Sequence, residues 1–166
     1  MRRKIVLISA VAAALVAAAH VTAAQAQQPP APSPPSAPAP YVLGMGDLMN
    51  TLVQPRHAKL GLAGAAGNWP LAAYALAEIR QVFGRIAAAV PKFRGYPVAD
   101  LADAALKQPL AAVDDAIKAQ DAKKFAAAYG ELTQGCNACH ASLDHPFVVI
   151  KVPDASAFPN QDFSKH

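Results

Sequence analysis

The chain has 166 residues, of which 54% are hydrophobic and 16% are charged, and it contains only two cysteines. Its formal net charge is +4, but three of the positive charges stand at Arg2, Arg3 and Lys4, and without them the balance is +1. A charge so close to neutral excludes a strongly basic protein, and we expect no nucleic-acid partner.

Residues 1–26 have the three parts of a secretory signal peptide. A basic start precedes an apolar run from Ile5 to Ala19, and Ala24-Gln25-Ala26 forms an A-x-A cleavage site. The apolar run is shorter than the roughly 20 residues that a membrane-spanning helix needs, which disfavours an uncleaved anchor. We therefore predict that the protein is exported and that the signal is removed.

Residues 27–40 form a segment too rich in proline for a helix or a sheet. We expect a disordered, extended polyproline II spacer. A flexible leader is the favoured interpretation, and a tether that holds the folded part away from a membrane or a partner is the alternative. No cysteine follows the signal, so no lipid anchor is expected at a processed N-terminal cysteine.

Residues 41–166 are expected to form a single domain of ordinary small size, and its apolar period is helical. The first helix is predicted between Gly44 and Ala66, with a kink at Pro55. Its apolar side consists of Met45, Leu48, Met49, Leu52, Leu60 and Ala63.

Three glycines recur at every third position near the end of this helix, but no Lys-Ser or Lys-Thr follows to complete a phosphate loop. Close helix packing is the better explanation of Gly61, Gly64 and Gly67.

The second helix is predicted to begin after Asn68, which is a plausible cap, with Pro70 in its first turn, and to end at Pro91. Trp69 and Tyr74 near its start are expected to be packing residues. Its buried stripe steps by three and four residues through Leu76, Ile79, Phe83, Ile86 and Val90.

A third helix is predicted between Asp100 and Ala119, where Leu110, Val113 and Ile117 share a face. Pro109 is expected to divide this stretch into a short lead-in and a main helix.

The last helix is predicted to begin after Asp121, a natural N-cap. Its apolar face continues through Phe125, Tyr129, Leu132, Cys136 and Cys139. Both cysteines of the chain therefore lie on the buried face of this helix.

Four helices in sequence predict an all-α, antiparallel up-down four-helix bundle. In that topology the first and last helices are neighbours, and the start of the first lies beside the end of the last. After the bundle, Phe147-Val148-Val149-Ile150 is rich in β-branched and aromatic residues, and its neighbours Pro146 and Pro153 bar a helix. We expect an extended C-terminal tail that lies across the bundle.

The two cysteines stand in the run Cys136-Asn137-Ala138-Cys139-His140, the Cys-x-x-Cys-His signature of covalent c-type haem attachment. Two thiols must add across the two vinyl groups of one porphyrin while a neighbouring imidazole reaches the iron. Residues three and four apart share a side of a helix, so all three side chains can face one macrocycle. We predict one covalent haem c, with Cys136 and Cys139 as thioether partners and His140 as the proximal iron ligand.

Three other interpretations of the cysteine pair are weaker. A thioredoxin-like redox dithiol normally opens a helix after a strand, and no strand pattern precedes this motif. A zinc site needs about four nitrogen or sulfur ligands, and the nearest additional candidate is His145 alone. A disulfide across three residues would be strained.

Four helices, the Cys-x-x-Cys-His motif near the end of the last one and a methionine-bearing first helix make roughly residues 42–142 similar to the class II c-type cytochromes, the cytochrome c prime and cytochrome c-556 group. The resemblance implies a periplasmic bundle. Its haem would be either five-coordinate, binding small gases, or six-coordinate through a first-helix methionine, carrying electrons to redox partner proteins. Bundles of this kind often pair through their first two helices, so a homodimer is a further expectation.

The chain departs from that family at two points. It continues for 26 residues past His140, where the family usually stops soon after the motif. The first helix also lacks the arginine that the family often carries shortly before its distal residue.

The sixth iron ligand is the residue on which the mechanism depends. Met49 is the first candidate, because it lies on the apolar face of the first helix and a thioether favours ferrous iron. Met45, one turn earlier, is the second. The alternative is that both are core methionines filling gaps around a large cofactor, which would leave the iron open on one side.

Two histidines are weaker candidates for that ligand. His57 lies eight residues beyond Met49, about 12 Å further along a helix, so the two cannot both serve. His145 is directly followed by Pro146, and an exposed tail histidine is the favoured interpretation.

Three classes of function remain, and electron transfer is preferred because two methionines stand where a ligand is needed. A binding module for nitric oxide or carbon monoxide is the alternative. A peroxidase-type enzyme has least support, because adjacent Arg56 and His57 point in different directions on a helix. Arg56 and Lys59 are expected on a solvated helix face rather than paired with haem propionates.

Overall fold

A computed structural model of the chain describes residues 41–165. The predictions for the signal peptide and the proline-rich segment, residues 1–40, lie outside the described residues. In chain order the elements are α1 (Met45–Leu48), a π-helix η1 (Met49–Val53), α2 (Gln54–Ala65), α3 (Trp69–Ala89), β1 (Lys92–Phe93), β2 (Tyr96–Pro97), α4 (Val98–Lys118) and α5 (Ala122–Ser142). Over the described range, no helix is both long enough and apolar enough to cross a membrane.

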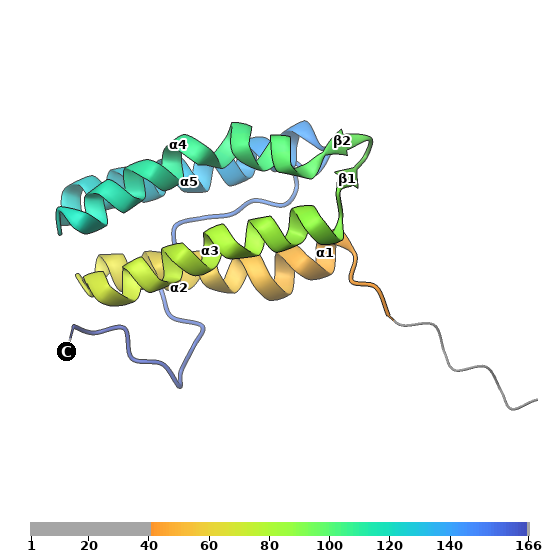
Figure 1. The fold of residues 1–166 in the computed structure, drawn as a ribbon. Coiled ribbons are helices and arrows are strands. Elements are labelled where there is room, and N and C mark those ends of the chain that lie inside the picture. The colour runs from red at the N-terminus through yellow and green to blue at the C-terminus, as the bar shows by residue number, and fades with distance from the viewer. Residues whose placement is uncertain (1–40, 166) are drawn as a thin grey trace, which may run out of the picture. The chain divides into compact units, whose positions relative to one another are not determined.

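The helices form the predicted antiparallel up-down bundle (Figure 1). Each of the helices α2 to α5 packs against its neighbours in sequence, and α2 also packs against α5. The first helical segment therefore begins at the end of the bundle where α5 finishes, as the topology predicts. This adjacency places residues that are almost a hundred positions apart around one space.

Two helix starts are fixed by the side chains that the sequence indicates. The Asn68 side chain accepts a hydrogen bond from the backbone N–H of Leu71, 3.2 Å away, at the start of α3. The carboxylate of Asp121 accepts from the N–H groups of Lys123 and Lys124, both at 3.0 Å, at the start of α5. Each cap satisfies donors that have no partner within the first turn of a helix.

Pro55 lies within the first helical stretch, and the irregularity beside it is the π-helix η1. The backbone N–H of Gln54 bonds to the carbonyl of Met49, five residues back, instead of four. Pro55 has no N–H to offer the carbonyl of Thr51, and a wider turn before the proline relieves the contact between its ring and that carbonyl. The helix resumes directly as α2.

The prediction that Pro109 divides the third helix is wrong. Helix α4 runs without a break from Val98 to Lys118 and contains Pro109. Proline leaves one carbonyl, that of Ala105, without its usual donor four residues on. That carbonyl faces Gly135 of α5, and tertiary packing of the long helix outweighs the lost hydrogen bond.

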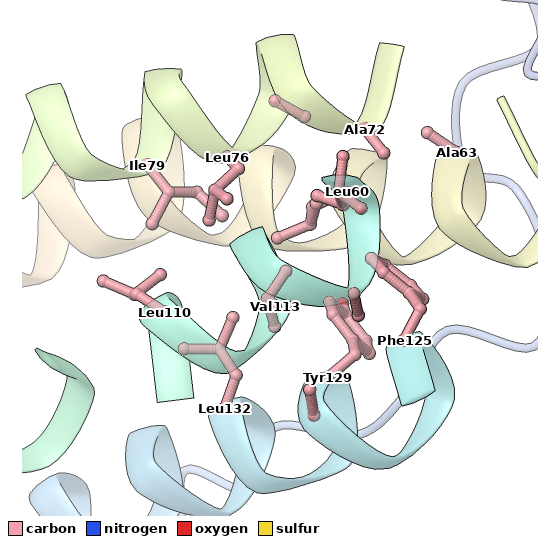
Figure 2. Close-up of a cluster of buried hydrophobic side chains, with 14 of the residues drawn as sticks. Leu60, Ala63, Ala72, Leu76, Ile79, Leu110, Val113, Phe125, Tyr129 and Leu132 are labelled. Carbon is pink, nitrogen blue, oxygen red and sulfur yellow. The ribbon is translucent and has the colours of Figure 1, made fainter. Parts of the chain in front are cut away.

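The main core lies between the two helix pairs and is filled from all four long helices (Figure 2). Close packing explains two of the three recurring glycines. A Cβ on Gly61 would lie 2.6 Å from the Tyr129 ring, and one on Gly64 would overlap the ring of Phe125. Small residues on α2 thus allow the aromatic residues of α5 to approach its backbone.

The packing prediction for the start of α3 is half right. Trp69 is buried and meets Phe125 edge to face, with 6.0 Å between ring centroids. Tyr74 is 64% exposed, so its predicted packing role is wrong.

A short β-hairpin with a two-residue turn joins α3 to α4. The helical pattern of the sequence did not predict it. Lys92 pairs with Pro97 and Phe93 with Tyr96, and the turn residues Arg94 and Gly95 both have positive φ, 51° and 88°. Two positive φ values match the twist that a tight hairpin needs.

The C-terminal tail is extended, as predicted, and contains no helix or strand between residues 146 and 165. It runs back along the bundle (Figure 1). In its last part, the carbonyl of Ser164 accepts a hydrogen bond from the Asn68 side chain at 2.7 Å, and Phe163 packs against the main core. In its first part, next to the end of α5, Val148 and Ile150 line a cavity.

Candidate functional site

A largely apolar cavity of about 220 Å³ lies at the end of the bundle where the first helical segment begins and α5 ends. Its walls come from α1, η1, α2, α3, the hairpin, α4, α5 and the tail. All the residues that sequence analysis singled out as haem or iron ligands line it, namely Met45, Met49, His57, Cys136, Cys139, His140 and His145. The fold therefore gathers the predicted site residues around one space.

The two cysteines are free thiols on the last two turns of α5, and both are partly buried. Burial raises the pKa of Cys136 to about 11 and also raises the pKa of Cys139, because a thiolate loses hydration there. A redox dithiol or a zinc site depends on the thiolate, which the start of a helix stabilises and its end does not. The end of a helix is therefore a poor place for either alternative.

His140 has one ring nitrogen engaged and the other free to bind iron. Its Nδ1 lies 2.9 Å from the carbonyl oxygen of Val148. A carbonyl only accepts, so Nδ1 carries a proton, and in the neutral imidazole the lone pair of Nε2 is then available. Histidines that bind metals typically donate their second N–H in this way. The donor set therefore fits a haem with His140 on one face.

Met49 stands at the first position of the π-helix, one turn after Met45. Both methionines are half-buried, and both pack against a small apolar cluster of Leu48, Val82, Ile86 and Val98. They reach the cavity from the first helical segment, across the bundle end from α5. Met49 and Met45 thus remain the candidates for a thioether ligand opposite His140.

His57 is buried, with 6% of its surface exposed, and its ring stacks on Tyr129 at 4.7 Å between centroids. Nδ1 lies 3.0 Å from the Tyr129 hydroxyl, and Nε2 lies 3.1 Å from the Thr133 hydroxyl. Each hydroxyl also reaches a backbone carbonyl, that of His57 at 2.7 Å and that of Tyr129 at 2.9 Å. Both ring nitrogens have partners, so His57 is not a free iron ligand.

The number of available hydrogens limits how many of the four contacts around His57 can be hydrogen bonds. Each hydroxyl has one hydrogen, so a neutral imidazole satisfies three of the four contacts at once, and only an imidazolium would satisfy all four. Burial lowers the pKa of His57 to about 4, because the charged ring would lose its hydration. At neutral pH the ring is therefore uncharged, and one of the four contacts has no hydrogen to share.

The expectation that His145 is an exposed tail residue is wrong. The ring is half-buried and lines the cavity, packed between Phe93 at 6.0 Å and Phe147 at 5.6 Å between centroids. Its Nδ1 lies 2.6 Å from the carbonyl oxygen of Leu143, to which it donates. An aromatic contact on each side places this histidine at the cavity wall despite Pro146.

The two cations of the first helix face away from the cavity. Arg56 pairs with Glu78 of α3 at 3.2 Å and donates to the carbonyl of Leu52 at 2.9 Å. The ammonium of Lys59 lies 4.8 Å from the centre of the Phe158 ring in the tail. Arg56 is thus in a half-buried ion pair rather than on a solvated face, and neither cation is among the lining residues.

Two residues that shape this site were not predicted from the sequence. Asn137, between the two cysteines, binds the tail through its amide, and Phe93 of the hairpin contributes an aromatic wall. The Arg94-Gly95 pair between Pro91 and Pro97 is a turn signal that could have predicted the hairpin. Nothing in the spacing of Asn137 indicates which residue its amide meets.

Comparison with protein-family models, curated proteins and solved structures finds no match to this chain. The geometry and chemistry of the cavity are therefore the basis for assigning a function.

Proposed function

We propose that this chain is an exported, periplasmic c-type cytochrome of the class II type that carries one covalent haem and transfers electrons between redox partner proteins. The observation that carries the proposal is the common cavity of Cys136, Cys139, His140 and the first-helix methionines. These residues come from opposite ends of the domain sequence, and all of them line the same cavity. A c-type haem needs side chains of these kinds around one space.

The attachment chemistry would use the two free thiols. Each thiol would add across one vinyl group, so that a sulfur–carbon bond forms and the hydrogen goes to the other vinyl carbon. This addition needs no oxidant, and Cys136 and Cys139 are one turn apart on the same face of α5. The bound haem would supply reversible one-electron chemistry at iron.

The remaining residues would hold the cofactor and exclude water. His140 is oriented by Val148, with Nε2 available as the proximal ligand. Apolar walls from Phe83, Val98 and Leu106 lower the local dielectric. Phe147 and Val149 are 77% and 72% exposed beside lining residues of the tail, and such an apolar rim suits transient docking of a partner protein.

Met49 is the proposed sixth ligand in this account. It is half-buried in the cavity wall opposite α5, and a thioether there favours ferrous iron and raises the reduction potential. A haem iron held by both His140 and Met49 would need little rearrangement between its oxidation states.

A gas-binding module is the second candidate, and the apolar character of the cavity supports it. If both methionines only fill space, the iron keeps an open face in an apolar pocket that nitric oxide or carbon monoxide can enter. The two functions need the same haem attachment and differ in one ligand.

Absorption spectra of the matured protein, oxidised, reduced and reduced under carbon monoxide, test the proposal. An electron carrier predicts low-spin spectra in both states and no change on adding carbon monoxide. High-spin spectra with ready uptake of carbon monoxide would replace electron transfer by gas binding. A colourless protein would exclude both.

A further inference from the structure

The tail is attached to the haem motif at two points, and both lie on one face of α5. The Asn137 side chain accepts a hydrogen bond from the N–H of Ile150 at 2.7 Å and donates one to the carbonyl of the same residue at 2.9 Å. One turn further on, His140 donates to the carbonyl of Val148 at 2.9 Å. The amide of Asn137 thus pairs with the tail as a neighbouring strand would.

The spacing of the partners explains why the two contacts form together. Asn137 and His140 are three residues apart on a helix and share a side. Val148 and Ile150 are two residues apart in an extended segment, so their backbone polar groups point the same way. A tail held at Ile150 by two hydrogen bonds therefore presents the carbonyl of Val148 to the imidazole.

We propose that Asn137 and the tail segment Val148 to Ile150 are positioning residues for the proximal histidine, which set its ring orientation and the electron density that it donates to iron. This inference rests on the proposed haem function. A His140 whose Nδ1–H is held by a carbonyl is a stronger electron donor, which stabilises ferric iron and lowers the reduction potential. The 26 residues after the motif thereby act on the redox centre as well as covering it.

The test compares Asn137→Ala with Gln134→Ala in the matured protein. Gln134 is an exposed amide one turn before Ala138 on the same helix, so its loss controls for helix composition. In Asn137→Ala we expect the Ile150 amide to exchange with deuterium roughly tenfold faster, as loss of hydrogen bonding worth about 1.4 kcal/mol implies. We also expect a higher reduction potential. Gln134→Ala should match the wild type in both measurements.

A second pair of variants leaves the haem motif untouched, in case Asn137→Ala does not mature. Ile150→Pro removes the N–H that the Asn137 oxygen accepts. Val152→Pro, two residues later and outside the paired segment, removes an N–H that makes no hydrogen bond to any residue in the described part of the chain. The potential should rise in Ile150→Pro and stay at the wild-type value in Val152→Pro.

The outcomes separate this inference from the proposed function. If exchange at Ile150 accelerates while the potential stays unchanged, the tail does not position His140 and the inference is wrong. If exchange does not accelerate, the Asn137 side chain does not hold the tail at Ile150, and the inference fails at its first step. A wild-type protein whose mass shows no haem would overturn the proposed function, and the exchange measurement would still test the pairing of Asn137 with Ile150.

Discussion

The carbonyl oxygen of Ala105 in α4 lies only 2.5 Å from the position that a Cβ on Gly135 of α5 would occupy. Pro109 leaves this carbonyl without its usual hydrogen-bond donor. Because Gly135 has no side chain, α4 and α5 can approach each other closely at this carbonyl. Contacts of a Cα–H group with a carbonyl recur where helices approach this closely. This close approach of the two helices lies one residue before Cys136, the first cysteine of the motif.

Gly135→Ala should destabilise the protein, because its methyl group would meet backbone rather than a flexible side chain. We expect a loss of about 1–3 kcal/mol in the free energy of unfolding, measured by urea denaturation. Gly130→Ala is the matched control in the same helix, since nothing lies within 4 Å of its added Cβ. It should gain about 0.5–1 kcal/mol from helix propensity. Equal effects of the two substitutions would contradict the close crossing.

Sequence patterns correctly predicted the helix caps and the apolar faces, which depend on residues close together in the chain. Asn68 and Asp121 cap helices because each side chain bonds to N–H groups two or three residues ahead, and the apolar stripes of α3 and α5 face the core. Pro109 shows the limit of such rules. A helix of 21 residues that packs along its length tolerates one missing hydrogen bond, which the sequence around the proline does not reveal.

The site was predictable to the extent that a motif or the topology places it. The spacing of Cys136, Cys139 and His140 predicts one face, and the up-down order predicts that Met49 lies near them. The partners of His57 and Asn137 were not predictable, because Thr133 lies 76 positions from His57 and Ile150 lies 13 from Asn137. Contacts across a fold depend on the packing and leave no local spacing to detect.

The buried His57 should make stability depend on pH in a defined window. Its pKa is lowered to about 4 in the folded protein from about 6.5 in the unfolded chain, so the unfolded state binds the extra proton first. Its stabilising contribution is complete above about pH 6.5 and is lost as the pH falls toward 4. The steepest slope for one proton is about 1.4 kcal/mol per pH unit, and the total is on the order of 3 kcal/mol.

Urea denaturation between pH 7.5 and 4.5 measures this slope in the wild type and in His57→Phe. The phenyl ring keeps a surface for stacking on Tyr129, and both hydroxyls keep a backbone carbonyl as acceptor. The variant should therefore fold and lose most of the slope. An unchanged slope would show that other groups dominate the pH dependence.

Met49→Ala should open the distal side of the iron. If Met49 is the sixth ligand, the variant changes from low-spin to high-spin, takes up carbon monoxide and has a lower reduction potential than the wild type. Met45→Ala removes a methionine from the same cavity wall one turn earlier and should leave the spectra unchanged. Loss of the low-spin spectrum in Met45→Ala alone would assign the ligand to Met45.

The mass of the intact, matured protein tests the central claim most directly. Wild-type protein expressed with a c-type maturation system and separated under denaturing conditions should have the mass of the processed chain plus one haem. The double variant Cys136→Ala, Cys139→Ala should have the mass of the bare chain. A wild-type protein that also has the mass of the bare chain under these conditions would contradict covalent haem attachment and, with it, the proposed function.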